Sequence, residues 1–538
     1  MQLSRRRFLA LSASIGLGAC ASSDGDEAAS PSASTEPSGS STTASPTTAP
    51  PATSTTTTDA PAATTTTEPE PDGIHLDVDP FTFGVASGDP DATSVVIWTR
   101  LDGDLPADGI DVAWAYAPDS GSGAIEGVVR TDASLGGSVH VIVETDSPGI
   151  FKFSAGGWKS PAGTTAPIDP TTSEFRIAAA SCQNYESGFY AAHRDIAEWR
   201  PDLVVFLGDF IYEGFSPALS DTIVRLHDPF EPVDLDGYRA RYAQYLRDPQ
   251  LQASRAAAPW LAIWDDHEVE NNYAGLVSED DADPAEFAVR RSQAYQAWWE
   301  NTPTRLPPPD LADPTTPYPI HRGLDVGELL RISALDGRQF RDDQLSDVIL
   351  DPGPPVDGWD DPGRSMLGAE QEAWAIERFA TSEATWNCLA QQTVFGDTRL
   401  GDVGAILNYD QWDGYAAARD RLLAAAPSNF VTITGDIHLA GVGEIFDAAG
   451  THGIEFVTTG ISSGQNVDPA LVDVVKSIPA IVDAELEFRG YTRHTISPTT
   501  WRAEYRQVVE IGDPDSDVRT WKTFEVPAGS PTVTEADV

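Results

Sequence analysis

The sequence has few basic residues and few cysteines. Only 34 of its 538 residues are Lys or Arg, against 83 Asp and Glu, and the formal net charge is −49. Such a chain is poorly suited to neutralising phosphates, which argues against nucleic-acid recognition and against adhesion to anionic lipid through basic patches. No run of 18 or more apolar residues occurs, so no bilayer-spanning helix is expected. The length instead predicts more than one folded core.

The first 20 residues have the pattern of an export signal. Arginines at 5–7 precede an apolar run of about a dozen residues, which ends in small residues. Two adjacent arginines before Phe8 and Leu9 are similar to the twin-arginine pattern, and residues 17–20, Leu-Gly-Ala-Cys, to a bacterial lipobox. We therefore expect twin-arginine export and an extracytoplasmic protein held at the membrane only by lipid on Cys20. The alternative is a general secretory signal with a chance cysteine.

Residues 21–72 are predicted to be a disordered tether. Between positions 21 and 70, Ser, Thr, Pro and Ala supply 41 of 50 residues, and no aromatic residue, Ile, Leu, Val or Met occurs. Without large apolar side chains the segment cannot offset the entropy of ordering its backbone. We expect it to hold the folded part away from the membrane surface.

Two regions with different strand patterns follow. Residues 73–165 alternate apolar and polar side chains in short stretches, which predicts a small all-β sandwich domain. Residues 174–538 carry buried-type strands separated by helical stretches, which indicates an α/β layer architecture. Strands are expected at 81–83, 94–99, 111–116 and 138–143 in the first region, and at 176–180, 203–207, 260–264, 430–434 and 454–459 in the second, with helices at 189–199, 283–300, 368–380 and 411–425.

Metal-binding residue types directly follow four of the strands in the second region. The loops read Ser181-Cys182-Gln183, Gly208-Asp209-Phe210-Ile211-Tyr212-Glu213, Asp265-Asp266-His267-Glu268-Val269-Glu270-Asn271-Asn272 and Gly435-Asp436-Ile437-His438. Ligands of open α/β sheets gather outside the carboxyl ends of the strands, so we expect the loops to build one site. A single Gly-Asp loop is usually an ordinary turn, but four such loops together predict metal binding.

The donor types in these loops indicate a mixed site. Thiolate and phenolate favour a transition ion, whereas carboxylate and amide oxygens suit a hard cation such as Ca²⁺. Asp209 could place one carboxylate oxygen on each of two ions about 3.5–4 Å apart. Such a pair clamps a phosphoryl group, activates a bound water as hydroxide and neutralises the leaving oxygen. The pattern therefore suits displacement at phosphorus, and bound cations would offset the acidity of the chain.

These motifs resemble those of the PhoD-like alkaline phosphatases of the metallophosphatase superfamily. Gly-Asp-x-x-Tyr and the strand-end Asp-His-Glu are similar to superfamily motifs, and the order of all motifs agrees. The matching stretches are 83–90, 98–100, 181–183, 208–213, 264–268 with 271–272, 367–371 with Trp374, and 435–438. The likeness covers about 80–500. It implies an α/β metallophosphatase sandwich of two mixed sheets flanked by helices, preceded by the small all-β sandwich domain.

The resemblance also implies roles for individual residues. Cys182, Asp209 and Tyr212 would bind Fe³⁺, and Asp209 would bridge to Ca²⁺, with other divalent ions as alternatives. His267 matches the superfamily position that stabilises charge or protonates the leaving alkoxide.

Four further residues would complete the ligand set, and they depart in part from the superfamily pattern. Asp266 stands where the superfamily usually has Asn, and Asn271 is a nearby oxygen donor. Asp436 and His438 stand where it commonly has two histidines. Oxygen in place of nitrogen is consistent with calcium in the second site, and the departures leave open which ligand binds which ion.

The predicted function is an exported, metal-dependent phosphoesterase of the alkaline phosphatase type that hydrolyses phosphate monoesters, diesters or both. A phospholipase D-like or teichoic-acid phosphodiesterase is the nearest alternative. A non-catalytic surface-binding lipoprotein is an alternative from another class, and the intact set of metal-binding residue types argues against it.

The remaining cysteines, arginines and histidines are given weaker roles. Cys182 and Cys388 could form a disulfide, although a buried, inert thiol is the favoured interpretation of Cys388. Arg194 is expected in a surface salt bridge, and Arg338 and Arg341 could line the pocket. Ordinary polar roles are expected for His193, His227, His321, His452 and His494.

Overall fold

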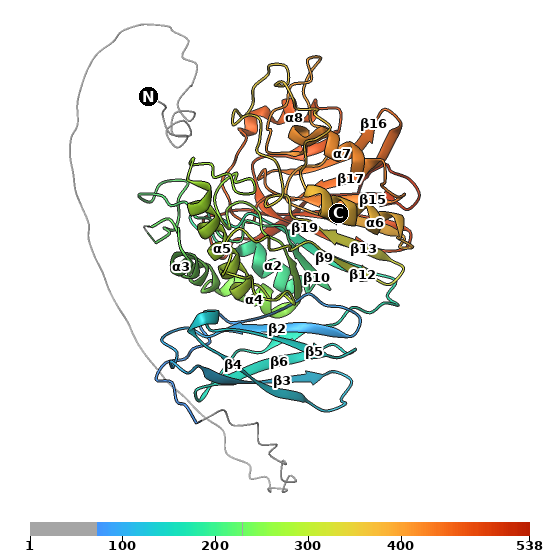
Figure 1. The fold of residues 1–538 in the computed structure, drawn as a ribbon. Coiled ribbons are helices and arrows are strands. Elements are labelled where there is room, and N and C mark those ends of the chain that lie inside the picture. The colour runs from blue at the N-terminus through green and yellow to red at the C-terminus, as the bar shows by residue number, and fades with distance from the viewer. Residues whose placement is uncertain (1–72, 229, 538) are drawn as a thin grey trace, which may run out of the picture. The chain divides into compact units, whose positions relative to one another are not determined.

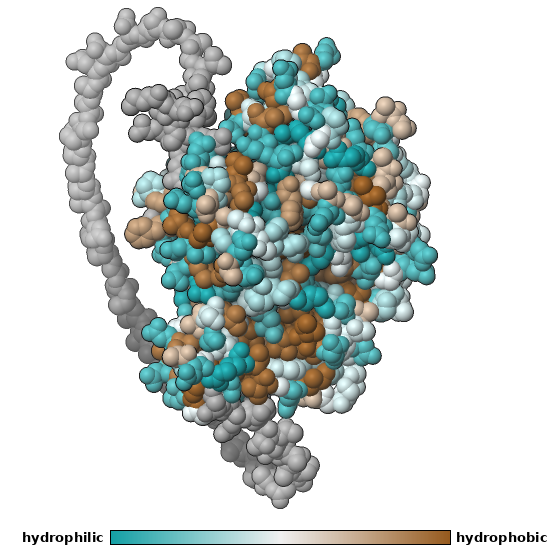
Figure 2. All heavy atoms as spheres, in the orientation of Figure 1, coloured by the Kyte–Doolittle hydropathy of each residue, from teal (hydrophilic) through white to brown (hydrophobic). Residues whose placement is uncertain are grey.

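The computed structural model describes residues 73–228 and 230–537. The export signal, Cys20 and the tether expected at 21–72 lie outside these residues. No helix within the described ranges combines the length and the apolar character needed to cross a membrane. Hydrophilic residues cover most of the face drawn in Figure 2, and apolar residues gather there in separate groups, one of them over strands β2 and β5.

A ten-stranded mixed sheet carries three of the four strand-end loops. Its central strands β9, β10 and β11 and the neighbouring β1 run parallel. Nearly all residues of these four strands are buried, as expected for a parallel sheet that is covered on both faces. In sheet order the strands are β22 (Thr534–Ala536), β21 (Val518–Pro527), β20 (Thr500–Val508), β19 (Arg489–Ile496), β9 (Phe175–Ala180), β10 (Leu203–Phe206), β11 (Pro259–Ala262), β1 (Val85–Gly88), β2 (Ser94–Arg100) and β5 (Ser138–Glu144).

A second mixed sheet of seven strands carries the fourth loop, which follows β15. Strands β13, β14, β15 and β17 run parallel within it. The two sheets meet at their strand ends, where Ser181 forms a bridge with Gly460 and the Thr458 hydroxyl donates to the Ala179 carbonyl at 3.2 Å. In sheet order the strands are β12 (Arg322–Val326), β13 (Leu330–Ala334), β14 (Trp386–Ala390), β15 (Phe430–Thr434), β17 (Gly450–Val457), β16 (Ala440–Asp447) and β18 (Ile481–Glu485).

Helices flank the two mixed sheets. Figure 1 shows α2 (Ala191–Trp199), α3 (Leu235–Leu246), α4 (Pro249–Ala257) and α5 (Pro284–Asn301) on one side, and α6 (Gly368–Ala380) and α7 (Ala416–Leu423) on the other. The short α8 (Val472–Lys476) precedes β18. The expected helices correspond to α2, α5, α6 and α7. The sequence pattern did not predict α3 or α4. The residues that α3 buries are mostly tyrosines and an arginine, and those that α4 buries are Leu251, Ser254 and Arg255, so polar side chains conceal the helical period in both.

The remaining strands form a small five-stranded sheet. Four of them follow the order β4 (Ile125–Thr131), β3 (Ile110–Pro118), β6 (Gly149–Ala155) and β7 (Trp158–Lys159), and β8 (Gly163–Thr165) also pairs with β6. Buried apolar residues of β3 and β6 pack with those of β2 and β5 in a separate core. Two sheets therefore face each other in this region, as in a sandwich.

Two details of this region were not expected from the sequence. Strands β1, β2 and β5 belong to the ten-stranded sheet, because β1 pairs in parallel with β11, with Ser87 opposite Pro259. This pairing satisfies backbone groups that would otherwise leave β11 as an open edge. The described residues accordingly form one compact unit. The strand expected at 81–83 is instead a turn, closed by a hydrogen bond from the Gly84 amide to the Phe81 carbonyl at 3.1 Å.

Candidate metal centre and active site

The four strand-end loops converge at one edge of the two sheets. The parallel strands β9, β10 and β11 point their carboxyl ends to the same side, so the residues after them become neighbours. The Cys182 amide donates to the Gly208 carbonyl at 3.1 Å, and the Gln183 amide donates to the Asp209 carbonyl at 3.0 Å. Backbone hydrogen bonds thus join the first two loops directly.

Four of the expected ligands have an unusual backbone conformation. The φ angles of Cys182, Asp209, Asp436 and His438 are 55°, 57°, 62° and 55°, in the left-handed region that residues other than glycine rarely adopt. Backbone strain of this kind costs roughly 1–3 kcal/mol per residue and persists where the surrounding structure enforces it. The strain at these four positions marks the loops as a functional site.

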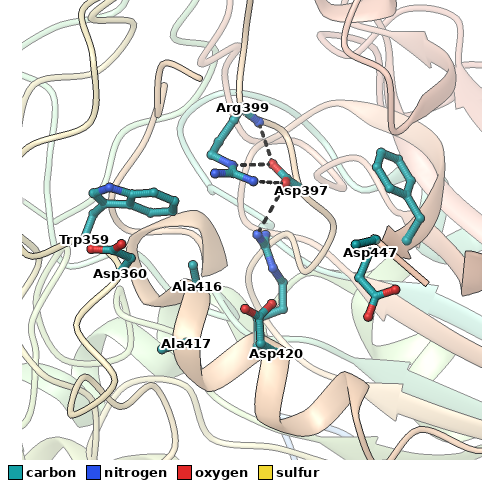
Figure 3. A pocket seen from close by; sticks show the side chains of 11 residues that line it. Trp359, Asp360, Asp397, Arg399, Ala416, Ala417, Asp420 and Asp447 are labelled. Atoms are coloured by element: carbon teal, nitrogen blue, oxygen red, sulfur yellow. Dashed lines mark hydrogen bonds and ion pairs between the residues drawn. The ribbon is translucent and has the colours of Figure 1, made fainter. Parts of the chain in front are cut away.

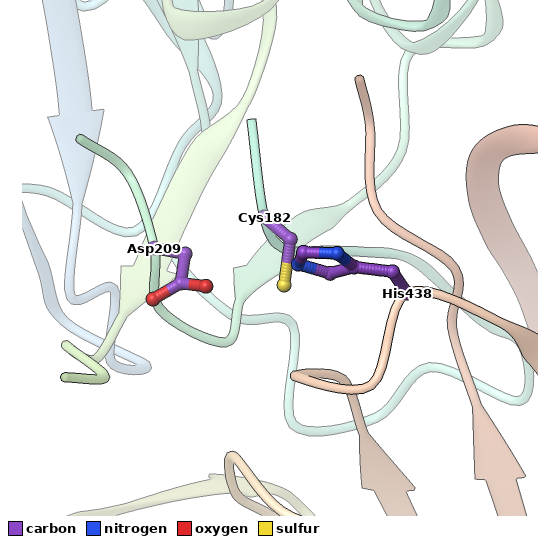
Figure 4. A group of neighbouring side chains, drawn as sticks. All are labelled: Cys182, Asp209 and His438. Carbon is purple, nitrogen blue, oxygen red and sulfur yellow. The ribbon is translucent and has the colours of Figure 1, made fainter. Parts of the chain in front are cut away.

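A thiol, a carboxylate and an imidazole form the first candidate metal group. Donor atoms of Cys182, Asp209 and His438 lie within 4.8 Å of one another, and all three residues are buried (Figure 4). The Tyr212 hydroxyl joins them: it donates to Asp209 Oδ2 at 2.8 Å and lies 3.1 Å from His438 Nε2. Sulfur, phenol oxygen and imidazole nitrogen together suit a transition ion.

Hydrogen bonding and burial set the protonation of these donors. His438 Nδ1 lies 2.6 Å from the Gly464 carbonyl, which requires the proton on Nδ1 and leaves Nε2 as the metal-binding atom. Burial lowers the pKa of His438 to about 3, so its ring is neutral. Burial, with a contribution from Asp209, raises the pKa of both Cys182 and Tyr212 well above the usual values. A bound cation opposes this effect because it binds the deprotonated forms.

Carboxylates dominate the neighbouring part of the site. Donor atoms of Asp209, Asp266 and His267 form a second group within 4.8 Å, and those of Asp265, Asp266 and Asp436 form a third. Asp209 and Asp266 are therefore each shared by two groups. Shared carboxylates at this spacing are the arrangement that bridges neighbouring cations.

The buried guanidinium of Arg338 lies among these carboxylates. It forms ion pairs with Asp265, with Asp410 at 2.8 Å, with Asp436 at 3.0 Å and with Asp266 at 3.5 Å. In spite of this cation, burial raises the pKa of Asp436 to about 6. One positive charge thus faces four carboxylates, and the sequence analysis did not anticipate Asp265 or Asp410.

Buried carboxylate oxygens without partners show that the site fits a cation. Asp209 Oδ1, Asp265 Oδ2 and Asp266 Oδ1 are buried and have no hydrogen-bond partner. Burial alone would raise the pKa of Asp266, but Arg338 and His267 hold it below its usual range, so this carboxylate is charged. Unpartnered buried acceptors are rare and costly, and a bound metal ion would satisfy them.

His267 lies beside the carboxylates and has its own acidic partner. Its Nδ1 lies 2.7 Å from Glu213 Oε2, and its ring lies 4.1 Å from the ring of Tyr212. Burial alone would lower the pKa of His267, but Glu213, Asp209 and Asp266 raise it well above its usual value. A protonated ring held at Nδ1 can donate a proton from Nε2. The sequence analysis assigned no role to Glu213, although its position directly after Tyr212 was a usable signal.

Glu268 is a further acidic residue to which the sequence pattern assigned no role. Its carboxylate accepts hydrogen bonds from the backbone amides of Asp209 at 3.0 Å, Phe210 at 2.6 Å and Asp265 at 2.8 Å. Burial raises its pKa to about 7. Glu268 therefore fastens the loop after β10 to the loop after β11. Its position directly after His267 was the only sequence signal.

Asn271 lies beside the His267–Glu213 pair. Its backbone amide donates to Glu213 Oε1 at 2.9 Å, and its side-chain amide donates to Glu279 Oε2 at 2.6 Å. The structure thus brings Asn271 to the His267 side of the site, with its amide nitrogen engaged by Glu279.

The arginines considered for phosphate binding already form ion pairs or hydrogen bonds within the protein. Arg338 and Arg341 are buried, and both form ion pairs with Asp410. They are internal counterions of the acidic cluster and do not line an open pocket. Arg194 lies at the surface as expected, where it donates to the Pro514 carbonyl at 3.1 Å and lies 4.0 Å from Asp515.

The two cysteines and most of the remaining histidines have structural surroundings. Cys182 and Cys388 are both free, so the disulfide considered above is not formed. Burial raises the pKa of Cys388, in agreement with an inert core thiol. Polar or aromatic neighbours surround His227 (Tyr245), His321 (Trp374), His452 (Asp447) and His494 (Trp501).

A surface pocket of about 600 Å³ lies outside the three candidate groups (Figure 3). Three of its charged residues are paired: Asp397 accepts from Arg399 Nε at 2.8 Å and lies 3.8 Å from Arg419, which also pairs with Asp413, outside the lining, at 2.6 Å. It is lined by Trp359, Asp360, Asp397, Arg399, Ala416, Ala417, Arg419, Asp420, Phe446, Asp447 and Ala448. The pocket shares no residue with the candidate metal groups.

Comparisons with known proteins identify the family of the chain. The sequence model of the PhoD-like phosphatases matches residues 177–505, and that of the PhoD-like phosphatase N-terminal domain matches residues 67–168. The chain is 37% identical over 478 residues to alkaline phosphatase D of Bacillus subtilis (strain 168), which covers 83% of this chain and 80% of that protein. It is also similar to the solved structure of PhoD, with a TM-score of 0.81, 35% identity, and coverage of 86% of this chain and 93% of the other. The chain is thus a phosphoric ester hydrolase and belongs to the PhoD-like phosphatase family.

Proposed function

We propose that this enzyme is a metal-dependent phosphoesterase that hydrolyses phosphate monoesters, diesters or both at the site described above. The observation that carries the proposal is the set of three buried carboxylate oxygens without hydrogen-bond partners, on Asp209, Asp265 and Asp266, of which the Asp266 oxygen also lies 3.5 Å from Arg338. Bound cations would satisfy these oxygens, neutralise a phosphoryl group in a strongly acidic chain and activate a water molecule.

The donor chemistry supports a division of the site between two kinds of ion. Cys182 offers sulfur, His438 an imidazole nitrogen and Tyr212 a phenolate oxygen, a set that favours a transition ion such as Fe³⁺. Asp266 and Asp436 offer only oxygen, which favours Ca²⁺ or another hard divalent ion. Asp209 lies between the two sets and would be shared.

The residues of the chain itself supply positioning and a proton. Glu213 holds the His267 ring at Nδ1, and the carboxylates around the ring keep it protonated. We propose that His267 Nε2 donates this proton to the leaving oxygen of the ester. Arg338 and Glu268 keep the acidic loops in place, the first by charge and the second by backbone hydrogen bonds.

Metal removal tests the proposal. The enzyme as purified should contain iron together with calcium or another divalent ion, and a phenolate on Fe³⁺ should colour it purple to pink. Exhaustive chelation should abolish the colour and reduce hydrolysis of both p-nitrophenyl phosphate and bis-p-nitrophenyl phosphate to background, and restoring the ions should recover it. Full activity in the stripped protein would contradict metal dependence, and a colourless active enzyme containing zinc and no iron would contradict the iron assignment.

We also propose that the enzyme is exported and anchored by lipid on Cys20, since residues 1–20 have the twin-arginine and lipobox patterns. Cys20→Ala should release active enzyme from the membrane fraction into the medium with unchanged specific activity, because the anchor and the site are far apart in sequence. Fractionation and a phosphatase assay measure this. Continued membrane attachment of the variant would count against the anchor.

A further inference from the structure

His193 on α2 lies behind the candidate site, in the core, and its two ring nitrogens have polar partners. The residue is fully buried, and its ring stacks against Phe206 and Trp260 with centroids 6.4 and 5.9 Å away. Its Nε2 lies 2.8 Å from Gln183 Oε1, and its Nδ1 lies 2.8 Å from the Ser254 hydroxyl. A hydrogen-bonded chain therefore runs from α4 through α2 to the loop that follows β9.

The partners of Gln183 fix the direction of this chain. The Gln183 side-chain nitrogen donates to the Phe210 carbonyl at 2.8 Å, so the oxygen of the same amide faces His193 and must accept. His193 Nε2 therefore carries the proton, and its Nδ1 is the acceptor that faces the Ser254 hydroxyl, which also lies 3.0 Å from the Leu251 carbonyl. Burial lowers the pKa of His193 to about 3, so the ring is neutral.

Gln183 connects the two loops that carry the first metal group. It follows Cys182 directly, its backbone amide donates to the Asp209 carbonyl at 3.0 Å, and its side chain binds the carbonyl of the next residue, Phe210. Both Cys182 and Asp209 have left-handed backbones, so their side-chain directions depend on contacts that hold these turns. Gln183 supplies two such contacts between the loops.

We infer that His193 is a positioning residue that orients Gln183 and so holds Cys182 and Asp209 at the separation needed for a shared cation. The inference rests on the proposed metal-dependent function. An apolar ring could fill the same space and stack on the same aromatic residues, but it could not donate to Gln183. The amide oxygen would then be buried without a partner, and Gln183 would be free to leave the Phe210 carbonyl.

Replacing the ring without changing its bulk tests this role. His193→Phe, in the full chain stripped of metal, should bind Co²⁺ about tenfold more weakly than the parent, as is typical for the loss of an outer partner of metal ligands. Titration followed by thiolate-to-cobalt absorption measures the affinity independently of turnover. His193→Gln carries an amide donor of similar reach and should restore affinity to within about threefold. Unchanged Co²⁺ affinity in folded His193→Phe would overturn the inference.

His494→Phe is the matched control for burying a phenyl ring in place of a histidine. His494 is also fully buried, but its Nδ1 accepts from Trp501, and it lies opposite Ile177, five residues before Cys182. The His494→Phe variant should have a lower melting temperature than the parent and an unchanged Co²⁺ affinity. An equal loss of affinity in this control would show that general destabilisation is responsible and would overturn the inference.

A second variant keeps the inference testable if His193→Phe does not fold. Gln183→Met should also weaken Co²⁺ binding about tenfold, and the double variant, if folded, should be no weaker than either single variant because both break one chain. Unchanged affinity in Gln183→Met, or additive losses in the double variant, would overturn the inference. Asp209→Ala distinguishes failure of the inference from failure of the proposed function. Parent-like Co²⁺ binding in Asp209→Ala would contradict the metal site itself. Loss of Co²⁺ binding in Asp209→Ala, but not in the His193 and Gln183 variants, would contradict only the positioning role.

Discussion

Replacing Asp209 by alanine should abolish both metal binding and turnover. Asp209 belongs to two of the three candidate groups, and one of its buried oxygens has no partner within the protein. Because stabilisation of charge by bound ions contributes several kcal/mol, we expect kcat/KM to fall by at least about 10³-fold. Elemental analysis and hydrolysis of p-nitrophenyl phosphate, measured on the same sample, follow the two losses together.

Asp89→Ala is a suitable control for this variant. Asp89 is also buried and forms an ion pair with Arg322 at 2.8 Å, but it belongs to none of the candidate metal groups. The Asp89→Ala variant should be less thermally stable than the parent, while its folded fraction keeps its metal content and kcat. A full complement of metals in Asp209→Ala would rule out the bridging carboxylate, and loss of metal in Asp89→Ala would attribute both results to unfolding.

The sequence could predict where the site lies because the relevant rule is local. A buried strand followed by a short loop with a metal-binding residue type can be recognised within about ten residues of sequence, and parallel strands bring such loops to one edge. Cys182, Asp209, Asp436 and His438 were found in this way, and the structure brings donor atoms of all four into the candidate groups. The role of Tyr212 came from the resemblance of its Gly-Asp-x-x-Tyr motif to those of the family, and its hydroxyl lies within hydrogen-bond distance of Asp209.

The charge arrangement within the site could not be predicted, since it depends on contacts between distant segments. Arg338 pairs with Asp265 and Asp410, each more than 70 residues away along the chain, and no local pattern distinguishes it from an arginine that lines a pocket. Glu268 and Glu213 act through hydrogen bonds to a backbone and to a ring whose positions depend on the whole fold. The left-handed φ angles also follow from tertiary contacts, because the residue types alone disfavour them.

The same limit explains why the sheet that each strand joins could not be predicted. Alternating side chains correctly indicated strands at 94–99, 111–116 and 138–143, which correspond to β2, β3 and β5. Alternation says nothing about which sheet a strand joins, and β1 finds its partner in β11, more than 170 residues later. At 81–83 the alternating Phe81 and Phe83 are buried in a turn rather than in a strand.

His267→Ala should separate proton donation from metal binding. The variant should retain nearly all of its metal and lose about 10²–10⁴-fold in turnover, which corresponds to roughly 3–5 kcal/mol of barrier. The loss should be larger for alkyl phosphates than for p-nitrophenyl phosphate, because nitrophenolate leaves without needing a proton. Steady-state kinetics with both ester types, alongside elemental analysis, measure the difference.

Glu213→Gln tests proton donation by His267 through the pH dependence of turnover. The donor must be protonated, so turnover falls as the pH rises through the pKa of His267. Glu213 helps to hold that pKa well above the usual value, which places the alkaline limb of the rate profile at high pH. The amide keeps a polar partner at Nδ1 but removes the negative charge. The pKa of His267 should therefore fall, and the alkaline limb should move to lower pH, with the steepest fall in rate along that limb for alkyl esters, whose leaving oxygen needs the proton.

Two results would assign His267 a different role. Its Nε2 or Nδ1 lies within 4.8 Å of carboxylate oxygens of Asp209 and Asp266, so the ring could itself be a ligand. Loss of metal in His267→Ala would establish that, and proton donation would then have to come from another group. If the variant keeps both metals and full activity on every ester, the ring has no catalytic role. The need for a proton rises with the basicity of the leaving oxygen. Proton donation by His267 therefore predicts that His267→Ala keeps its metal and that the loss of turnover grows as the leaving group becomes more basic. Only a proton donor gives this result.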